Sequence, residues 1–148
     1  MKLEKKYFDN VLIFRLNKYK DKRGCFFETF NKNDNIFKKY IKKNFLYDAI
    51  SVNKKNVFRG LHYQTKYKQS KLVHVIEGKI IDIVLDLRKN SKTFLNFKKI
   101  VLSEDNNRII FIPEGYAHGF ITLSKKAVVS YKISNKYNRK YEKTIFWN

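Results

Sequence analysis

The stretch KLVHVIEGKIIDIVLDLR, residues 71–88, decides the expected fold. Its two halves, 71–77 and 80–88, are rich in Val, Ile and Leu and have the length of strands rather than helices. Gly78 and Lys79 stand between the halves, and a glycine between two apolar runs is a turn signal. We therefore predict that the two halves form a hairpin.

Side-chain alternation along residues 80–88 separates two faces. One face is apolar and consists of Ile81, Ile83, Leu85 and Leu87. The other is mixed and consists of Ile80, Asp82, Val84, Asp86 and Arg88. The mixed face fits either solvent exposure or a partly polar interior, and Ile80 and Val84 keep the second interpretation open.

The rest of the chain continues the pattern of short strands and turns. Further strands are expected at 11–15, 25–30, 94–103, 108–113, 119–124 and 128–134. One helix is expected in the N-terminal half, with Asn33 or Asp34 as its cap and with apolar residues at helical spacing, namely Ile36, Phe37, Tyr40, Ile41 and Phe45. No linker or repeat divides residues 1–148, so we expect one mostly β domain, an antiparallel barrel or sandwich.

Charge is the most unusual property of the composition. The 33 Lys and Arg residues exceed the 13 Asp and Glu residues, which gives a net charge of +20. A nucleic-acid binder is disfavoured, because the lysines are spread along the whole chain rather than gathered in one segment. A basic surface that attracts an anionic small molecule is the preferred interpretation. The 13 Phe and 10 Tyr residues suit a core or a substrate pocket.

The location of the protein is inferred from cysteine usage and hydropathy. Cys25 is the single cysteine, so no intrachain disulfide can form. The N-terminal MKLEKKYFDN lacks an apolar core, so no signal peptide is expected, and no apolar run approaches a membrane span. We expect a cytoplasmic protein with no membrane partner.

The candidates for chemistry are few. Of the three histidines, His62 and His118 each lie close to a glycine, where a ligand can approach the backbone. Tyr131 shares a strand face with Val129 and Ile133, which is also compatible with a purely structural ring. A metal-binding cupin is disfavoured, because no His-x-His pair exists and Gln64 stands two residues after His62.

Several segments together carry a family resemblance. Residues 58–64 (FRGLHYQ), 69–73 (QSKLV), 82–88 (DIVLDLR) with 91–94 (SKTF), and 112–120 (IPEGYAHGF) are similar to signature segments of the dTDP-4-dehydrorhamnose 3,5-epimerases. Residues 21–28 (DKRGCFFE) resemble a further family motif near the N-terminus. Tyr131-Lys132, Tyr137, Glu142 and Trp147-Asn148 follow in the family's order.

The resemblance implies a fold and an activity. The fold would be a cupin-like double-stranded β-helix, a jelly-roll barrel, with one short helix in the N-terminal half. The activity would be epimerisation of a dTDP-linked 4-keto-6-deoxy sugar at C3 or C5 or both, by a homodimer that needs no metal or other cofactor. The product would enter the synthesis of a surface polysaccharide.

The resemblance also implies roles for residues. His62 would be the base, Lys71 would stabilise the enolate oxygen, and Tyr131 would deliver a proton from the opposite side. The other substrate-binding residues would be Arg23, Phe26, Glu28, Arg59, Gln64, His118, Tyr137 and Glu142. Arg59 and His118 would contact the substrate near its phosphates, and Arg23, Phe26 and Glu28 would contact the nucleotide across the dimer interface.

The sequence departs from the family pattern in three ways. An Asp that pairs with the base in the family has no counterpart up to Asn148, so Asp82 and Asp86 are the candidates for orienting His62. Tyr47 and Ala49 replace the family's Gln and Asn ahead of residues 58–64, which affects recognition of the nucleotide. Ser70 and His74 replace a Gly and an Arg.

Two other functions stay open on sequence alone. A sugar-nucleotide 3,4-ketoisomerase belongs to a related compact cupin group, but that group usually carries the His-x-His pair that Gln64 interrupts. A non-catalytic sugar-nucleotide-binding cupin is the alternative from another class. The presence of His62, Lys71 and Tyr131 together favours the epimerase over this binder.

Overall fold

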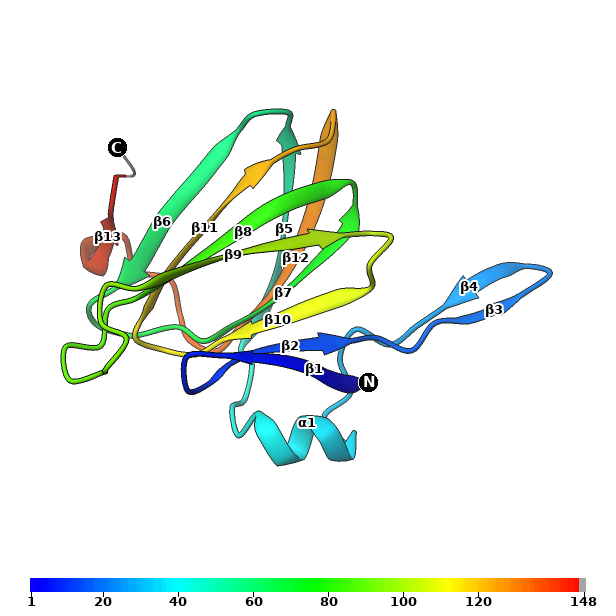
Figure 1. Ribbon diagram of the computed structural model, residues 1–148, viewed down its shortest axis with the longest axis horizontal. Helices are drawn as coiled ribbons and strands as arrows, with labels where there is room; N and C mark the ends of the chain where they lie inside the picture. The colour runs from blue at the N-terminus through cyan, green and yellow to red at the C-terminus, as the bar shows by residue number, and fades with distance from the viewer. Residues whose placement is uncertain (147–148) are drawn as a thin grey trace.

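The computed structural model describes residues 1–146 as two antiparallel sheets that face each other (Figure 1). The six-stranded sheet runs in the order β1 (Lys2–Tyr7), β2 (Val11–Arg15), β10 (Arg108–Ile112), β7 (Lys71–Glu77), β12 (Lys126–Ile133) and β5 (Tyr47–Lys54). The five-stranded sheet runs in the order β13 (Glu142–Thr144), β6 (Phe58–Gln64), β11 (Tyr116–Thr122), β8 (Lys79–Asp86) and β9 (Phe97–Ser103). This arrangement confirms the predicted mostly β, jelly-roll architecture.

The core lies between the two sheets. Its members come from both of them and include Val73 and Val75 on β7, Ile80 and Val84 on β8, and Phe120 on β11, all at most 1% exposed. The mixed face of β8 therefore points into the barrel, where its Asp82 and Asp86 side chains are completely buried. The sequence allowed this face to be either exposed to solvent or part of a partly polar interior, and the structure shows that it is part of the interior.

The predicted hairpin of residues 71–77 and 80–88 is wrong. β7 pairs with β10 and β12, whereas β8 pairs with β9 and β11 in the opposite sheet. Gly78 has a φ of +81°, and a Cβ at this position would collide with the backbone of Lys126. The glycine thus marks a corner, where the chain leaves one sheet, passes against β12 and enters the other sheet.

The predicted helix is confirmed, but it is shorter than its apolar pattern suggested. α1 spans Asn35–Tyr40, and the Asp34 side chain caps it by accepting hydrogen bonds from the amides of Ile36 and Phe37. Phe45 lies beyond the helix end, yet its ring still packs edge-on against Phe30. The apolar spacing therefore continued past the helix because the following loop covers the same part of the core.

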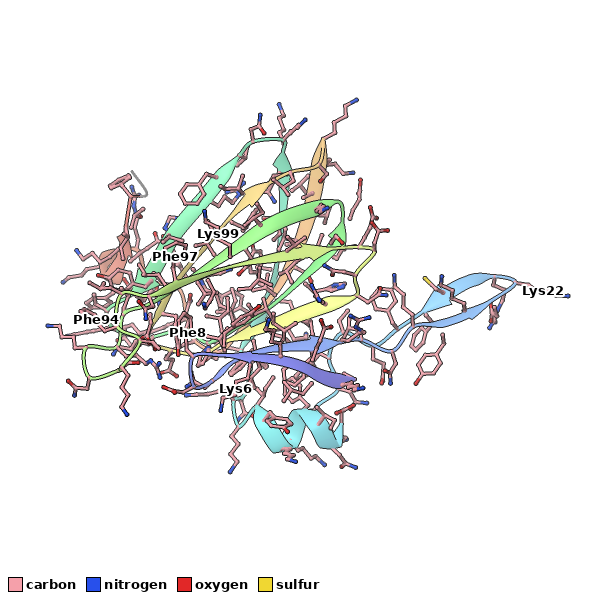
Figure 2. The ribbon with its side chains drawn as sticks, viewed as in Figure 1. Lys6, Phe8, Lys22, Phe94, Phe97 and Lys99 are labelled. Carbon is pink, nitrogen blue, oxygen red and sulfur yellow. The ribbon has the colours of Figure 1, made fainter. Side chains whose placement is uncertain are left out.

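A two-stranded ribbon, β3 (Tyr19–Asp21) and β4 (Gly24–Phe26), projects away from the barrel (Figure 1). Lys22 lies at its tip (Figure 2), and the Phe26 side chain is 68% exposed. We call residues 19–26 the arm. A single turn of 3-10 helix, Arg139–Tyr141, precedes β13. Within residues 1–146, no helix is both long and apolar enough to span a membrane.

Candidate active site

A cavity of about 230 Å³ opens between the two sheets, and four of the predicted site residues from three strands line it. They are His62 and Gln64 on β6, Lys71 on β7 and His118 on β11. The remaining lining residues are Tyr63, Thr65, Lys68, Gln69, Leu87, Ile112, Gly115 and Tyr116. Two histidines, two lysines and two glutamines line the cavity beside apolar residues such as Leu87 and Ile112, and such a combination of polar groups with apolar walls is usual for a small-molecule site.

Two glycines bring β6 and β11 close together at this cavity. A Cβ at Gly60 would lie 2.5 Å from Cα of Gly119, and one at Gly119 would collide with the carbonyl of Arg59. The two strands can approach so closely only because both positions lack a side chain. The resulting register places His62 directly opposite His118.

The Nδ1 atom of His62 faces strand β13. It lies 3.2 Å from the Thr144 hydroxyl and 3.7 Å from a carboxylate oxygen of Glu142. Burial lowers the pKa of His62 below 6.5, Glu142 opposes that shift, and the charges of Lys71 and the other nearby cations add to it. The imidazole is therefore biased towards its neutral form, which is the form that can accept a proton.

Neither acidic residue expected to orient His62 does so. Asp82 accepts a hydrogen bond from Nε2 of His118 at 2.7 Å, and Asp86 binds the Arg88 guanidinium and the hydroxyls of Ser91 and Thr93. Both carboxylates are the buried partners of other groups, so that prediction is corrected. The carboxylate beside His62 is Glu142, which the sequence had suggested as a substrate ligand.

Lys71 points into the cavity from the sheet opposite His62. Burial lowers the pKa of its ammonium group below 10.5, while the charges of Glu142 and Asp82 partly restore it. No salt bridge to Lys71 is found among the described residues. A buried ammonium group in this position can stabilise negative charge that develops on a bound molecule.

Tyr131 lies on β12, in the sheet that faces the one carrying His62, and it is not among the cavity-lining residues. Its hydroxyl is 3.2 Å from the Ser51 hydroxyl. The Asn53 amide donates to Ser51, and its carbonyl oxygen accepts from Arg59. Burial raises the pKa of Tyr131 to about 12, although the Ser51 hydrogen bond reduces this effect. The phenol therefore keeps its proton at neutral pH.

Gln64 and Tyr137 hold other protein groups. The Gln64 amide donates to the carbonyls of Tyr67 and Lys136 and accepts from the Asn138 amide, so its polar atoms fasten the loop before β13. Gln64 also lines the cavity, so its expected role as a substrate ligand stays a prediction. The Tyr137 hydroxyl donates to Glu142 at 2.8 Å.

The three residues expected to bind the nucleotide lie at or beside the arm, away from the cavity of their own chain. Arg23 bonds to Asp21 within the arm, Phe26 is exposed, and Glu28 accepts from Asn31. The cavity within a single chain therefore lacks these contacts. Trp147 and Asn148, which also contribute to the family resemblance, lie outside the described residues.

Sequence reasoning missed three polar residues around the site. The bond of Ser51 to Tyr131 was not foreseen, and neither Asn53 nor Thr144 was singled out. Ser51 and Asn53 alternate with the apolar Ile50 and Val52 on β5, and this period of two was the available signal. No comparable pattern marked Thr144. Within residues 1–146, no three His, Cys, Asp or Glu side chains form a metal-binding group.

Comparisons with known proteins agree on one group. The family model described as dTDP-4-dehydrorhamnose 3,5-epimerase matches residues 5–148. The dTDP-4-dehydrorhamnose 3,5-epimerase of Methanothermobacter thermautotrophicus is 43% identical over 141 residues, which cover 95% of this chain and 75% of that protein.

Two solved structures are similar over nearly the whole chain. The Bacillus anthracis dTDP-4-dehydrorhamnose 3,5-epimerase with bound TDP and PPi has a TM-score of 0.95 and 34% identity, covering 99% of this chain and 85% of that one. The Legionella pneumophila dTDP-6-deoxy-D-glucose-3,5-epimerase in complex with dTDP-4-keto-L-rhamnose has a TM-score of 0.94 and 35% identity, covering 99% and 78%.

Proposed function

We propose that this chain, which belongs to the dTDP-4-dehydrorhamnose 3,5-epimerase family, epimerises a dTDP-linked 4-keto-6-deoxy sugar at C3 and C5 through an enolate. The observation that carries the proposal is the shared cavity of His62 and Lys71, with Tyr131 on the facing sheet. Inversion at carbon requires a base and an acid on opposite sides of the sugar ring, and facing sheets supply opposite sides.

His62 is the proposed base. It removes the proton next to the C4 ketone, and the electron pair of the broken C–H bond moves onto the ketone oxygen. Its lowered pKa keeps the imidazole neutral near pH 7. Lys71 faces the same cavity and stabilises the enolate oxygen as its charge develops, which is usually a large contribution to catalysis.

Tyr131 is the proposed acid. Its raised pKa leaves the hydroxyl protonated at neutral pH, so it has a proton to return to the carbon. The hydrogen bond with Ser51 fixes the direction of the hydroxyl and stabilises the phenolate after transfer. Its ring packs against the core between the two sheets, on the sheet that faces the one carrying His62.

Substrate binding is assigned to residues in and near the cavity. Arg59 and His118 are proposed to contact the sugar nucleotide near its phosphates, and Tyr137 and Glu142 to contact the sugar. His118 is held in place by its buried bond to Asp82. The excess of positive charge also favours an anionic pyrophosphate substrate.

We further propose a homodimer in which the arm of each chain reaches the cavity of the other. Ile50 and Val52 on β5 and Ile76 on β7 expose 65, 62 and 47% of their surface on the outer face of the six-stranded sheet. Such a strip is suited to contact with another protein surface. A second copy would also supply Arg23, Phe26 and Glu28, which lie away from their own cavity. A single cytoplasmic domain of residues 1–148, without cofactor, completes the proposal.

Deuterium exchange tests the proposed reaction. The protein is incubated with dTDP-4-keto-6-deoxyglucose in D₂O, and the sugar protons are followed by NMR. We expect exchange at C3 and C5 with the wild-type chain. His62→Ala should abolish exchange at both carbons, whereas Tyr131→Phe should permit exchange but impair inversion. Tyr7→Phe removes a tyrosine hydroxyl on β1, outside the cavity, and serves as the matched control.

The outcomes separate the alternatives. Movement of the carbonyl from C4 to C3 would support the ketoisomerase instead. Measurable binding without any exchange would support a binding protein. Full exchange in His62→Ala would overturn the assignment of the base.

A further inference from the structure

We propose that Thr144 is a positioning residue for His62: its hydroxyl accepts a hydrogen bond from Nδ1–H and leaves Nε2 free to take the substrate proton. This inference rests on the proposed function, because it assumes that His62 is the base. It adds a residue that neither the sequence motifs nor the family resemblance indicated.

Strand pairing places Thr144 at His62. β13 pairs with β6 in an antiparallel register that sets Thr144 opposite His62 and Glu142 opposite Gln64. The next two residues, Leu61 and Ile145, exchange backbone hydrogen bonds of 3.1 and 2.8 Å, which fixes this register beside His62 and Thr144. Because alternate residues of a strand share a face, Thr144 and Glu142 both face the side of His62, while Lys143 faces away.

Thr144 and Glu142 act on His62 in different ways. The Thr144 hydroxyl is 3.2 Å from Nδ1, which is within hydrogen-bond range. The nearest Glu142 oxygen is 3.7 Å away, beyond that range, and the other Glu142 oxygen accepts from Tyr137. Thr144 therefore directs the ring, and Glu142 contributes an attractive charge.

The direction of this hydrogen bond decides which nitrogen can react. In neutral imidazole one nitrogen carries the proton and the other is the acceptor. When Thr144 accepts from Nδ1–H, the lone pair lies on Nε2. After proton transfer both nitrogens carry protons, the C–H electron pair resides on the enolate oxygen beside Lys71, and Glu142 faces the imidazolium. Thr144 keeps its bond through the step, so the ring does not turn.

Two substitutions at one position isolate the hydroxyl. Thr144→Val replaces the hydroxyl with a methyl group of similar size, and Thr144→Ser restores it. Lys143→Ala changes the outward-facing neighbour on the same strand and serves as the control. The kcat and KM of deuterium exchange are measured for each variant, and nitrogen-15 NMR of the imidazole reports which nitrogen of His62 carries the proton.

We expect the kcat of Thr144→Val to fall by about five- to tenfold with KM within twofold, which is the size of one hydrogen bond. Thr144→Ser should recover most of this loss, and Lys143→Ala should behave as wild type. His62 should carry its proton on Nδ1 in the wild type and become a mixture of tautomers in Thr144→Val. A purely structural role of Thr144 would not change the tautomer.

Two results would overturn the inference. One is a wild-type His62 that carries its proton on Nε2, and the other is a Thr144→Val variant with unchanged kcat and tautomer. In both cases the loss of exchange in His62→Ala would leave the base assignment standing. If His62→Ala retained exchange, the proposed function itself would fail, and the two failures are thereby distinguished.

Discussion

His62 and Lys71 face one cavity, and burial lowers the pKa of both side chains. The proposed reaction needs His62 without its proton and Lys71 with its proton. The active form therefore exists between the two pKa values, and Tyr131, with a pKa of about 12, stays protonated throughout this range. The electrostatics of single residues thus set the pH range of activity.

The first consequence is a bell-shaped pH profile of kcat/KM. Activity should fall as pH decreases through the His62 pKa, which is below 6.5, and as pH increases through the Lys71 pKa, which is below 10.5. Exchange rates measured from pH 4.5 to 10.5 test this directly. In Lys71→Arg, the alkaline decline should disappear from the range, because Arg keeps its charge. An alkaline decline that persists in this variant would assign it to another group.

Single residues also explain what could be foreseen of the site. His62, Lys71 and His118 were predictable because each lies in a distinctive motif, and the structure brings them into one cavity. Thr144 and Asn53 were not predictable, because their importance arises from strand register between segments far apart in the chain. Asp82 was expected near His62 but pairs with His118, since β8 lies beside β11 rather than β6.

At the scale of elements, short sequence patterns predicted those features that depend on contacts between residues close together in the chain. Asp34 predicted the start of α1, since a cap bonds to amides two and three residues ahead. Gly78 and Lys79 predicted a hairpin turn, but they form a corner between the two sheets. A glycine with positive φ is found both in hairpin turns and in such corners, so the residue type alone does not separate them. Only the packing of β12 against Gly78 distinguishes them, and this contact joins residues almost fifty positions apart.

Strand β7 carries a histidine whose burial should make stability depend on pH. His74 is 4% exposed on the outer face of β7, its Nδ1 has no hydrogen-bond partner, and its ring packs edge-on against Phe27 beyond the arm. Burial lowers the pKa of His74 to about 4. The unfolded chain, with a pKa of 6.5, therefore binds a proton first as pH falls, and folding loses stability between pH 6.5 and 4.

We expect His74 to account for a loss of roughly 2 kcal/mol between pH 7.5 and pH 5. Urea unfolding of the wild type and of His74→Leu at both pH values measures this contribution. The pH-dependent loss should be smaller in His74→Leu by about that amount. An equal loss in the two proteins would show that His74 is already protonated in the folded state or remains hydrated there.

At the scale of the whole molecule, charge and apolar surface act in opposite directions. A chain of charge +20 repels its copies, while the strip of Ile50, Val52 and Ile76 favours their contact. Salt shortens the range of charge repulsion, to about 10 Å at 0.1 M ionic strength, and leaves apolar contact largely intact. The proposed dimer should therefore tighten as salt is added.

Sedimentation at 50 and 500 mM NaCl tests this expectation. The dimer dissociation constant should decrease at the higher salt concentration, and Ile50→Asp should shift the protein towards monomer at both. Val101→Asp places the same charge on an exposed position of β9, in the other sheet, and should leave the dimer intact. A monomeric wild-type chain at both salt concentrations would contradict the dimer.

The pairing of β13 with β6 also has a consequence in time. β6 is made early in translation, but the strand that completes its outer edge follows about eighty residues later. Contacts between such distant segments form slowly, because a long loop must close first. A folding chain that has paired β6 with β11 but has not yet added β13 therefore encloses much of its cavity while His62 lacks its neighbours on that strand. Catalytic competence thus requires this edge strand as well as the cavity itself.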